Sequence, residues 1–422
     1  MLAWDFVTAS DSSSTRWLRS MREQTLAQLG DAGLGYTITS VEEDFSEHSL
    51  RRVRGTFTVP RFLSQTDVAV AEATLTFDAS GAPVQDGTYQ APFTLVLPRA
   101  ALTGPVKLLL FGHGFLGSGE DEIGGAEGSY LQTFADLHGY ALVATDWSGL
   151  SKYEGVDAAG SAAAAFALAD MNAFPWVSDR LHQAMVAAMT LARTARGALA
   201  GDEALFVGGA QVIEDDRIDY YGISLGGVMG AVLMGYSPDL ERGVLNVGGA
   251  GWSLLLQRST NWALFKLLLD GSYPDKLDQQ MVIDVIQAYL DPADGMTAAP
   301  LLSAPLPGNP AKRILLQMAV GDAQVPNLSS EAYARSVGLP VLEDAASKPW
   351  GLDVAPTPLP SALSVWDTHE PEAPPETNTS SVSIDNSTHG KIRALPALMD
   401  QVDVFLRTGE VQATCDGLCD PE

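Results

Sequence analysis

The sequence predicts an α/β protein with a mostly parallel central sheet that is flanked by helices. From about residue 105 onward, short continuous apolar runs alternate with segments of helical periodicity. Strands that are apolar on both sides are typical of a parallel sheet covered on both faces. The predicted strands of this sheet are 107–111, 140–145, 218–221, 244–247, 314–320 and 363–366.

The apolar periodicity of the sequence predicts two of the helices that cover this sheet. Apolar residues recur at helical spacing from Ser178, which we expect to act as the N-cap, to Gly197, which we expect to end the helix. His182 lies beside the apolar stripe, and we expect it to be a packing or surface histidine. The last helix carries its apolar positions between 392 and 406, and Gly409 follows it.

Residues 1–100 have a different pattern, which predicts a small α+β elaboration packed on the main domain. Its first element is a helix over 14–29. Alternating strands follow, with a hairpin turn at 78–81 between two of them. These strands are predicted at 36–41, 53–59, 71–77 and 93–97.

The main domain is expected to span 101–414, with a short tail over 415–422. Two stretches, about 151–177 and 253–310, are too long for a simple alternation of strands and helices. We expect them to be helical, lid-type insertions at the strand ends that form a lid or a pocket wall. The alternative is that they add structural helices only.

The charge balance excludes several classes of partner. The 422 residues include 25 basic and 52 acidic side chains, which gives a net charge of −27. Such a surface repels nucleic acid and anionic membranes, so neither is an expected partner. The sequence also contains no apolar run long enough to span a bilayer. It says nothing about the oligomeric state.

Cys415 and Cys419 are the two cysteines of the chain. Two thiols cannot make a four-cysteine zinc site. They form either a local disulfide, which is typical of exported proteins, or a pair of free thiols. The first residues are too short and too polar for a signal peptide. We therefore expect a secreted or cell-envelope protein whose leader has been removed, with a cytoplasmic location as the alternative.

The strongest chemical signal surrounds Ser224. A predicted strand runs into Gly222-Ile223-Ser224-Leu225-Gly226, and a helix rich in small residues follows. This is the G-x-S-x-G turn that lifts a nucleophilic serine out of a sheet. Glycine is required two residues before and after the serine because side chains there would collide with neighbouring elements. The N–H of Leu225 points from the start of the helix and can stabilise an oxyanion.

A second signal follows the strand at 107–111, in the sequence Gly112-His113-Gly114-Phe115. It resembles the His-Gly-X oxyanion loop of α/β-hydrolases. That resemblance implies that the N–H of Phe115 joins that of Leu225 in the oxyanion hole, and that His113 supports the loop.

The same glycines also match a dinucleotide-binding fingerprint, with Gly117 as the third glycine. That motif needs a helix to open at Gly117 and meet a pyrophosphate. Here Ser-Gly-Glu-Asp-Glu follows, and its three carboxylates would repel the pyrophosphate. Nucleotide binding is therefore not expected.

The remaining two candidates are an acid and a base. Asp322 directly follows the apolar strand at 314–320, which is where this arrangement places the carboxylate that orients a catalytic histidine. Two histidines follow Asp322. His389 lies in a loop just before the final helix and is the expected base, and His369 is the alternative.

From about 105 to 410 the chain resembles an α/β-hydrolase, and within that superfamily the bacterial esterases and lipases. The resemblance implies an α/β-hydrolase fold, a Ser-His-Asp triad, an acyl-enzyme intermediate, and no metal or organic cofactor. The substrate would be a small or polymeric carboxylic ester, and lipids and polyesters are included. The alternatives are an acyltransferase or peptidase on the same fold, or a catalytically silent surface-binding module.

Several large apolar residues lie near the predicted strand ends or in the insertions. They would line the substrate pocket, with Trp147 as the first candidate because it directly follows a sheet strand. The other candidates are Phe115, Leu116, Trp252 and Trp262.

Overall fold

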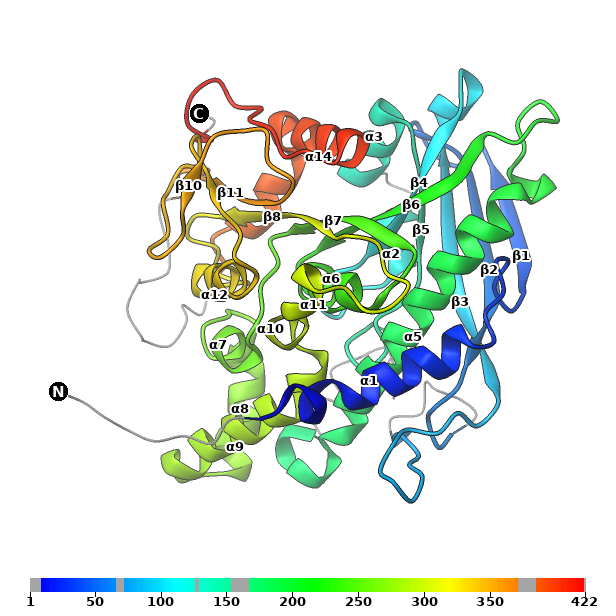
Figure 1. Ribbon diagram of the computed structural model, residues 1–422. Coiled ribbons are helices and arrows are strands. Elements are labelled where there is room, and N and C mark those ends of the chain that lie inside the picture. Colours follow the sequence, from blue (N-terminus) through cyan, green and yellow to red (C-terminus); the bar gives the residue numbers. More distant parts are fainter. Residues whose placement is uncertain (1–8, 66–71, 126–128, 153–166, 371–384, 421–422) are drawn as a thin grey trace.

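A computed structural model describes residues 9–65, 72–125, 129–152, 167–370 and 385–420 (Figure 1). Within these residues, one sheet of 11 strands runs through the molecule in the order β1-β2-β3-β5-β4-β6-β7-β8-β11-β9-β10. Neighbouring strands from β5 to β10 are parallel, whereas β1, β2, β3 and β5 pair antiparallel. The mostly parallel sheet predicted from the sequence is confirmed.

The strands are β1 (Tyr36–Glu43), β2 (Ser49–Pro60), β3 (Thr88–Pro98), β4 (Val106–Gly112), β5 (Tyr140–Ala144), β6 (Ile213–Ile223), β7 (Leu240–Asn246), β8 (Arg313–Ala319), β9 (Val341–Leu342), β10 (Val354–Ala355) and β11 (Ala362–Trp366). All five residues of β5 and of β11 are buried, as expected for strands with a helical layer on either side.

Helices cover both faces of the sheet (Figure 1). On one face α5 (Pro175–Gly197) contacts β2 and β6, and α6 (Leu225–Tyr236) contacts β4, β6 and β7. On the other face α3 (Tyr130–His138) contacts β3 and β5, and α14 (Pro396–Thr408) contacts β7. The first helix, α1 (Asp11–Leu26), lies against α5.

The remaining helices are α2 (Gly119–Ile123), α7 (Trp252–Leu256), α8 (Trp262–Ser272), α9 (Lys276–Leu290), α10 (Gly295–Ala298), α11 (Pro300–Ser303), α12 (Asn327–Val337) and α13 (Thr388–Lys391). Helices α7 to α11 account for most of the predicted insertion at 253–310. Much of the insertion predicted at 151–177 lies outside the described residues. None of the described helices has the length and apolarity that a membrane crossing requires.

Three details differ from the sequence-based predictions. Strands β1 to β3 continue the central sheet, because β3 pairs with β5, so they do not form an elaboration packed on it. The predicted strand at 71–77 is reduced, in its described part, to isolated bridges such as Leu63 with Leu75. Helix α5 begins at Pro175, whose fixed φ suits a first helical turn, so Ser178 lies inside the helix and is not its cap.

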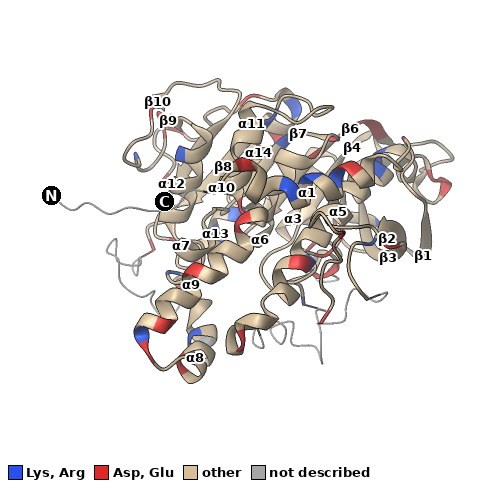
Figure 2. Cartoon of the chain, turned by 60° about the horizontal axis from the view of Figure 1, so that its bottom comes forward, with Lys and Arg blue, Asp and Glu red and all other residues tan. Residues whose placement is uncertain are grey.

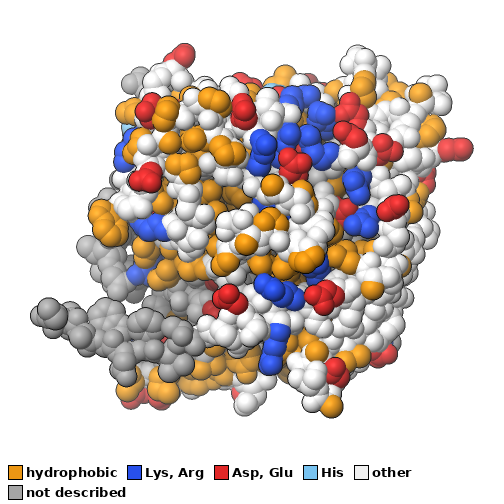
Figure 3. Space-filling view, in the orientation of Figure 1, with side chains coloured by type: hydrophobic (Ala, Val, Ile, Leu, Met, Phe, Trp, Pro, Cys, Tyr) orange, Lys and Arg blue, Asp and Glu red, His pale blue; other side chains and the backbone are white. Residues whose placement is uncertain are grey.

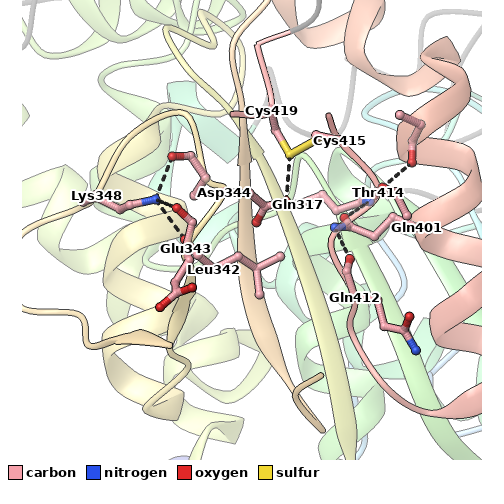
Figure 4. The surroundings of a disulfide bond; sticks show 12 residues. Gln317, Leu342, Glu343, Asp344, Lys348, Gln401, Gln412, Thr414, Cys415 and Cys419 are labelled. Carbon is pink, nitrogen blue, oxygen red and sulfur yellow. Dashed lines mark hydrogen bonds between the residues drawn. A yellow bond between two sulfur atoms is a disulfide. The ribbon is translucent and has the colours of Figure 1, made fainter. Parts of the chain in front are cut away.

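The chain ends on a short disulfide-closed loop that is held against the sheet (Figure 4). Cys415 and Cys419 are bonded to each other. The Cys419 N–H donates to Asp344 O at 2.8 Å, and the Asp367 N–H donates to Cys419 O at 2.9 Å. The alternative of two free thiols is therefore wrong, and the tail is fixed to the segments that flank β11.

Acidic and basic groups are interspersed on the surface. Figure 2 shows Asp and Glu spread over many helices and loops. In the face shown in Figure 3, basic side chains gather near the top, with acidic side chains beside them. Two arginines of the chain bond to backbone instead of to acidic groups alone: Arg217 and Arg242 both donate to Leu406 O near the end of α14.

Candidate active site

Ser224 occupies a strained turn between β6 and α6. Its backbone has φ 54° and ψ −118°, a conformation that side-chain-bearing residues rarely adopt. The turn is held from both sides, since the Ser224 N–H donates to Asn246 O at 3.0 Å and Ser224 O accepts the N–H of Val228 at 3.0 Å. Strained backbone of this kind is retained where the surrounding structure fixes it, and it often marks a functional site.

The glycines around Ser224 are required by close backbone contacts. A Cβ on Gly226 would lie 2.0 Å from Gly112 O, and one on Gly222 would lie 2.3 Å from Gly226 O. Further along α6, a Cβ on Gly230 would lie 2.2 Å from the ring of Tyr220. These distances confirm that glycine lets the start of α6 lie directly against β4 and β6.

The loop after β4 is ordered by His113, whose side chain is fully buried. Its Nε2 accepts the N–H of Trp147 at 2.8 Å, and its Nδ1 lies 2.8 Å from Gly114 O. A carbonyl needs a donor, so Nδ1 carries the proton and the imidazole is neutral. Both ring nitrogens are therefore used in holding the loop, and His113 has no nitrogen left to act as a base.

The backbone N–H groups of Phe115 and Leu225 have no hydrogen-bond partner among the described residues. The same loop approaches the serine closely, because a Cβ on Gly114 would lie 3.6 Å from Ser224 Cβ. Two amide hydrogens without partners beside one hydroxyl are the elements of an oxyanion hole.

Asp322 and His389 are brought together at the carboxyl end of the parallel strands. The Asp322 carboxylate follows β8, and its Oδ1 accepts the N–H groups of Gln324 and Val325 at 2.8 and 3.0 Å. Its Oδ2 lies 2.6 Å from His389 Nδ1. Because Oδ2 needs a donor, Nδ1 carries the proton and Nε2 is the basic nitrogen of the neutral ring.

The Nε2 atom of His389 is buried and has no hydrogen-bond partner among the residues that the structure describes. A hydroxyl or a substrate proton can therefore bind there. Among the described contacts there is none between this nitrogen and Ser224 Oγ, and such contacts often tighten only when substrate is bound. The other candidate base, His369, is more than half exposed and faces Asp367 and Asp420, at 3.6 and 4.0 Å.

An apolar cavity opens beside Ser224. Its wall includes Phe115, Trp252 and Trp262, which the sequence analysis named as candidates, and also Leu225 and Phe265. None of the described residues that line it is charged. The others that line it are Val228, Leu255, Leu256, Ser259, Asn261, Gln324 and Val325.

Two residues expected in the pocket lie elsewhere. Trp147, the first candidate, is buried behind the loop, where its ring lies against His113. Leu116 also does not line the cavity, because its N–H donates to Leu150 O at 3.1 Å and this part of the loop turns away. The position of Trp147 directly after β5 did not place it in the pocket, because the loop after β5 turns back behind the loop after β4.

A second, polar hollow adjoins the first and shares Gln324 with it. It contains His389 together with Asp385, Lys391 and Arg393. Gln324 Nε2 donates to Asp385 Oδ2 at 3.1 Å across its floor. No sequence pattern singles out Gln324, because its relevance lies in lining both hollows.

Comparison with known proteins finds distant likenesses in solved structures. The acetyl xylan esterase 1 of Thermoanaerobacterium sp. JW/SL YS485 is 11% identical with a TM-score of 0.46, over 85% of this chain and 90% of that chain. An acetyl xylan esterase from Paenibacillus sp. R4 is 14% identical with a TM-score of 0.44, over 83% and 88%. A thermostable esterase from Pseudomonas putida ECU1011 is 15% identical with a TM-score of 0.41, over 96% and 91%.

No protein-family model and no curated protein sequence matches the chain. At these TM-scores the likenesses are remote, so the classification rests on this chain's own features. These are the mostly parallel sheet, the strained serine turn after β6, and the chain order Ser224, Asp322, His389. Together they give the chain the α/β-hydrolase fold.

Proposed function

We propose that the protein is a serine hydrolase that cleaves carboxylic esters through an acyl-enzyme intermediate. The observation that carries this proposal is the pairing of Asp322 with His389 Nδ1 at 2.6 Å, which leaves a buried, unpartnered Nε2 at the strand edge that carries Ser224. The carboxylate on Nδ1 distinguishes His389 from the buried His113 and His182, whose Nδ1 atoms both lie against backbone carbonyls.

In the first half-reaction, His389 Nε2 takes the proton of Ser224 Oγ while this oxygen attacks the ester carbonyl carbon. The carbonyl oxygen becomes an oxyanion that accepts the N–H groups of Phe115 and Leu225. The tetrahedral intermediate collapses, and the alcohol leaves with the proton from His389. Asp322 keeps the imidazole oriented and stabilises its protonated form.

In the second half-reaction, His389 takes a proton from water, and the resulting hydroxide attacks the acyl carbon bound to Ser224. Collapse of this intermediate breaks the bond to Oγ, which recovers the proton from His389. The carboxylic acid is released and the enzyme returns to its starting state. These steps use side chains and water alone.

The cavity supports an apolar acyl or aryl group. Its aromatic wall of Phe115, Trp252, Trp262 and Phe265 has no charged group to solvate an anionic substrate. Esters of medium-chain or aromatic acids fit this chemistry, and lipids or polyesters that contain such acids are included in the proposal. The insertion 253–310 contributes two of these four aromatic residues, Trp262 and Phe265, which supports its interpretation as a lid or pocket wall.

The test is a panel of p-nitrophenyl esters from acetate to laurate, assayed beside the matching anilides and with added alcohol acceptors. We expect hydrolysis of the esters, a preference for acyl chains longer than acetate, and no activity in Ser224→Ala. Amide cleavage or transfer to alcohols would indicate a peptidase or an acyltransferase. No activity, together with no labelling of Ser224 by a fluorophosphonate, would indicate a silent binding module.

We also propose that the protein acts outside the cytoplasm, supported by the disulfide between Cys415 and Cys419. Fractionation of the native host, with detection of the protein in the medium or envelope, tests this location. Recovery from the cytoplasm with reduced cysteines would contradict it.

A further inference from the structure

Glu122 makes a buried contact with the loop that carries Phe115. Its Oε1 accepts the N–H of Gly114 at 2.7 Å. On the other side of Phe115, the N–H of Leu116 donates to Leu150 O at 3.1 Å. The two amides that flank Phe115 are therefore tied to the protein, whereas the described residues supply no partner for the amide of Phe115.

The direction of the Phe115 N–H is set by the carbonyl of the same peptide. Gly114 O accepts the Nδ1–H of His113 at 2.8 Å and the N–H of Gly117 at 3.1 Å. In a planar trans peptide the carbonyl and the following N–H point in opposite directions. Because Gly114 O is held on one side of the loop, the Phe115 N–H points to the other side. Glu122 holds the preceding peptide, between His113 and Gly114, through the Gly114 N–H.

The loop leaves space for this carboxylate by using glycine. A Cβ on Gly117 would lie 2.8 Å from Glu122 Oε1, and a Cβ on Gly114 would lie 3.2 Å from it. The point occupied by the second Cβ is also only 4.0 Å from Ser224 Oγ. The carboxylate and the serine hydroxyl thus both lie within 4.0 Å of one point beside a single glycine.

The other groups around Glu122 come from three elements. Burial raises the pKa of its carboxyl group, and the N–H of Gly114 acts in the opposite direction. Among its charged neighbours, Arg393 lowers this pKa, whereas Asp121 raises it. Arg393 follows the α13 segment that carries His389, so the carboxylate lies between the oxyanion loop and the segment of the base.

Anchoring of helix α2 does not account for this contact. Ser118 already caps the helix, since its Oγ accepts the N–H of Asp121 at 3.1 Å. Asp121 also pairs with Lys152 at 2.7 Å on the exposed side. Glu122 is the residue of α2 whose side chain reaches inward to the loop. Burying its carboxyl group costs free energy.

We propose that Glu122 is a positioning residue of the oxyanion hole, which holds the Gly114 peptide so that the Phe115 N–H faces Ser224. This inference rests on the proposed ester hydrolysis. The property that matters is an acceptor oxygen at the right distance from Gly114 N, and a glutamine supplies that oxygen as well as a glutamate does.

The test compares three variants of Glu122 with a matched variant on the same helix. Glu122→Leu removes the acceptor, Glu122→Asp keeps the charge but shortens the side chain, and Glu122→Gln keeps the length and an acceptor oxygen. Asp121→Leu is the control, because it removes a carboxylate that faces solvent. The readouts are kcat, KM, the rate of Ser224 labelling by an uncharged fluorophosphonate, and the melting temperature.

Loss of one oxyanion donor lowers turnover by about 10²–10³-fold, so displacing one should cost about tenfold or more. We expect this loss in kcat and in the labelling rate for Glu122→Leu and Glu122→Asp, with KM nearly unchanged. Glu122→Gln should lose less than about threefold, because its amide oxygen accepts the same N–H. The control should match the unmodified protein.

Wild-type kcat in both Glu122→Leu and Glu122→Asp would overturn the inference, and so would an equal loss in Glu122→Gln and Glu122→Asp, which would assign the effect to charge. If Glu122→Leu does not fold, the comparison of the Asp and Gln variants still decides. Failure of the proposed function has a different signature: the unmodified protein would neither hydrolyse the ester panel nor react with the fluorophosphonate at Ser224.

Discussion

The Nδ1 atom of His389 lies 2.6 Å from Oδ2 of Asp322, and both side chains are almost completely buried. The remaining carboxylate oxygen is occupied by two backbone N–H groups, so the carboxylate has one orientation. Exclusion of water strengthens the attraction between this carboxylate and an imidazolium ion. The pair can therefore stabilise the protonated state of His389 that ester cleavage requires.

The first prediction separates the two late histidines. His389→Ala should lower kcat by about 10⁴–10⁶-fold, because no other group can take the serine proton. His369→Ala should leave kcat unchanged, since its side chain is exposed and, among the described residues, its ring pairs with Asp367 and Asp420 rather than with the candidate site. Steady-state kinetics on a p-nitrophenyl ester checks both. The opposite pattern would assign the base to His369.

The second prediction concerns the acid. Asp322→Asn should lower kcat by about 10⁴-fold, because an amide that donates to His389 would stabilise the wrong tautomer. Asp367→Asn, which alters the neighbour of His369, is the control and should retain activity. Full activity in Asp322→Asn, with folding confirmed by circular dichroism, would remove Asp322 from the mechanism.

The residues of the candidate site could be predicted from the sequence because each lies at a fixed distance from a strand. Ser224 follows β6, Asp322 follows β8 and Phe115 follows β4, and parallel strands bring their carboxyl ends to one edge of the sheet. The strand positions of the sheet were predictable for the same reason, since apolar runs are a local signal.

The cavity wall could not be predicted in the same way. Phe265, which was not among the candidates, lines it because α8 lies across the site, and the position of that helix depends on tertiary packing. Trp147 has the sequence context of a wall residue, yet its backbone is bonded to His113 and its ring is buried behind the loop. The contact of Glu122 with Gly114 likewise appears only once α2 is placed.

A third prediction uses the strain at Ser224. Both Ser224→Gly and Ser224→Ala should be inactive, but the glycine variant should be the more stable of the two. A side chain in such a backbone conformation costs about 1–3 kcal/mol of strain, which glycine removes. The greater freedom of glycine in the unfolded chain cancels about 0.5–1 kcal/mol of this gain in stability. Urea unfolding of the two variants measures the difference. Greater stability of Ser224→Ala would show that the turn is unstrained.

The fourth prediction tests the contact between β4 and α6. Gly226→Ala should lose activity and at least about 1–3 kcal/mol of unfolding free energy, because its Cβ would lie 2.0 Å from Gly112 O. Gly104→Ala is the matched control, since a Cβ there meets nothing within 4 Å and its φ is not positive. Thermal and urea unfolding compare the two. Equal stability would mean that the start of α6 can move away from β4.

A fifth prediction follows from His182, which is buried in α5. Its Nδ1 donates to Ser178 O at 2.7 Å, and burial lowers the pKa of its imidazole to about 4. In the unfolded chain the pKa is about 6.5, so between these values the unfolded state binds more protons than the folded state. The contribution of His182 to stability is therefore complete above pH 6.5 and is lost as the pH falls toward 4.

The measurement is the unfolding free energy of the wild type and of His182→Leu at several pH values between 7.5 and 4.5. At neutral pH the variant should lose about 1 kcal/mol with the hydrogen bond to Ser178. As the pH falls, the wild type should lose up to about 3 kcal/mol that the variant does not lose. Asp179 on the same helix acts in the opposite direction, because burial raises the pKa of its carboxyl group to about 6, but it is present in both proteins and cancels. Parallel curves for the two proteins would show that His182 accepts a proton as easily in the folded state as in the unfolded one.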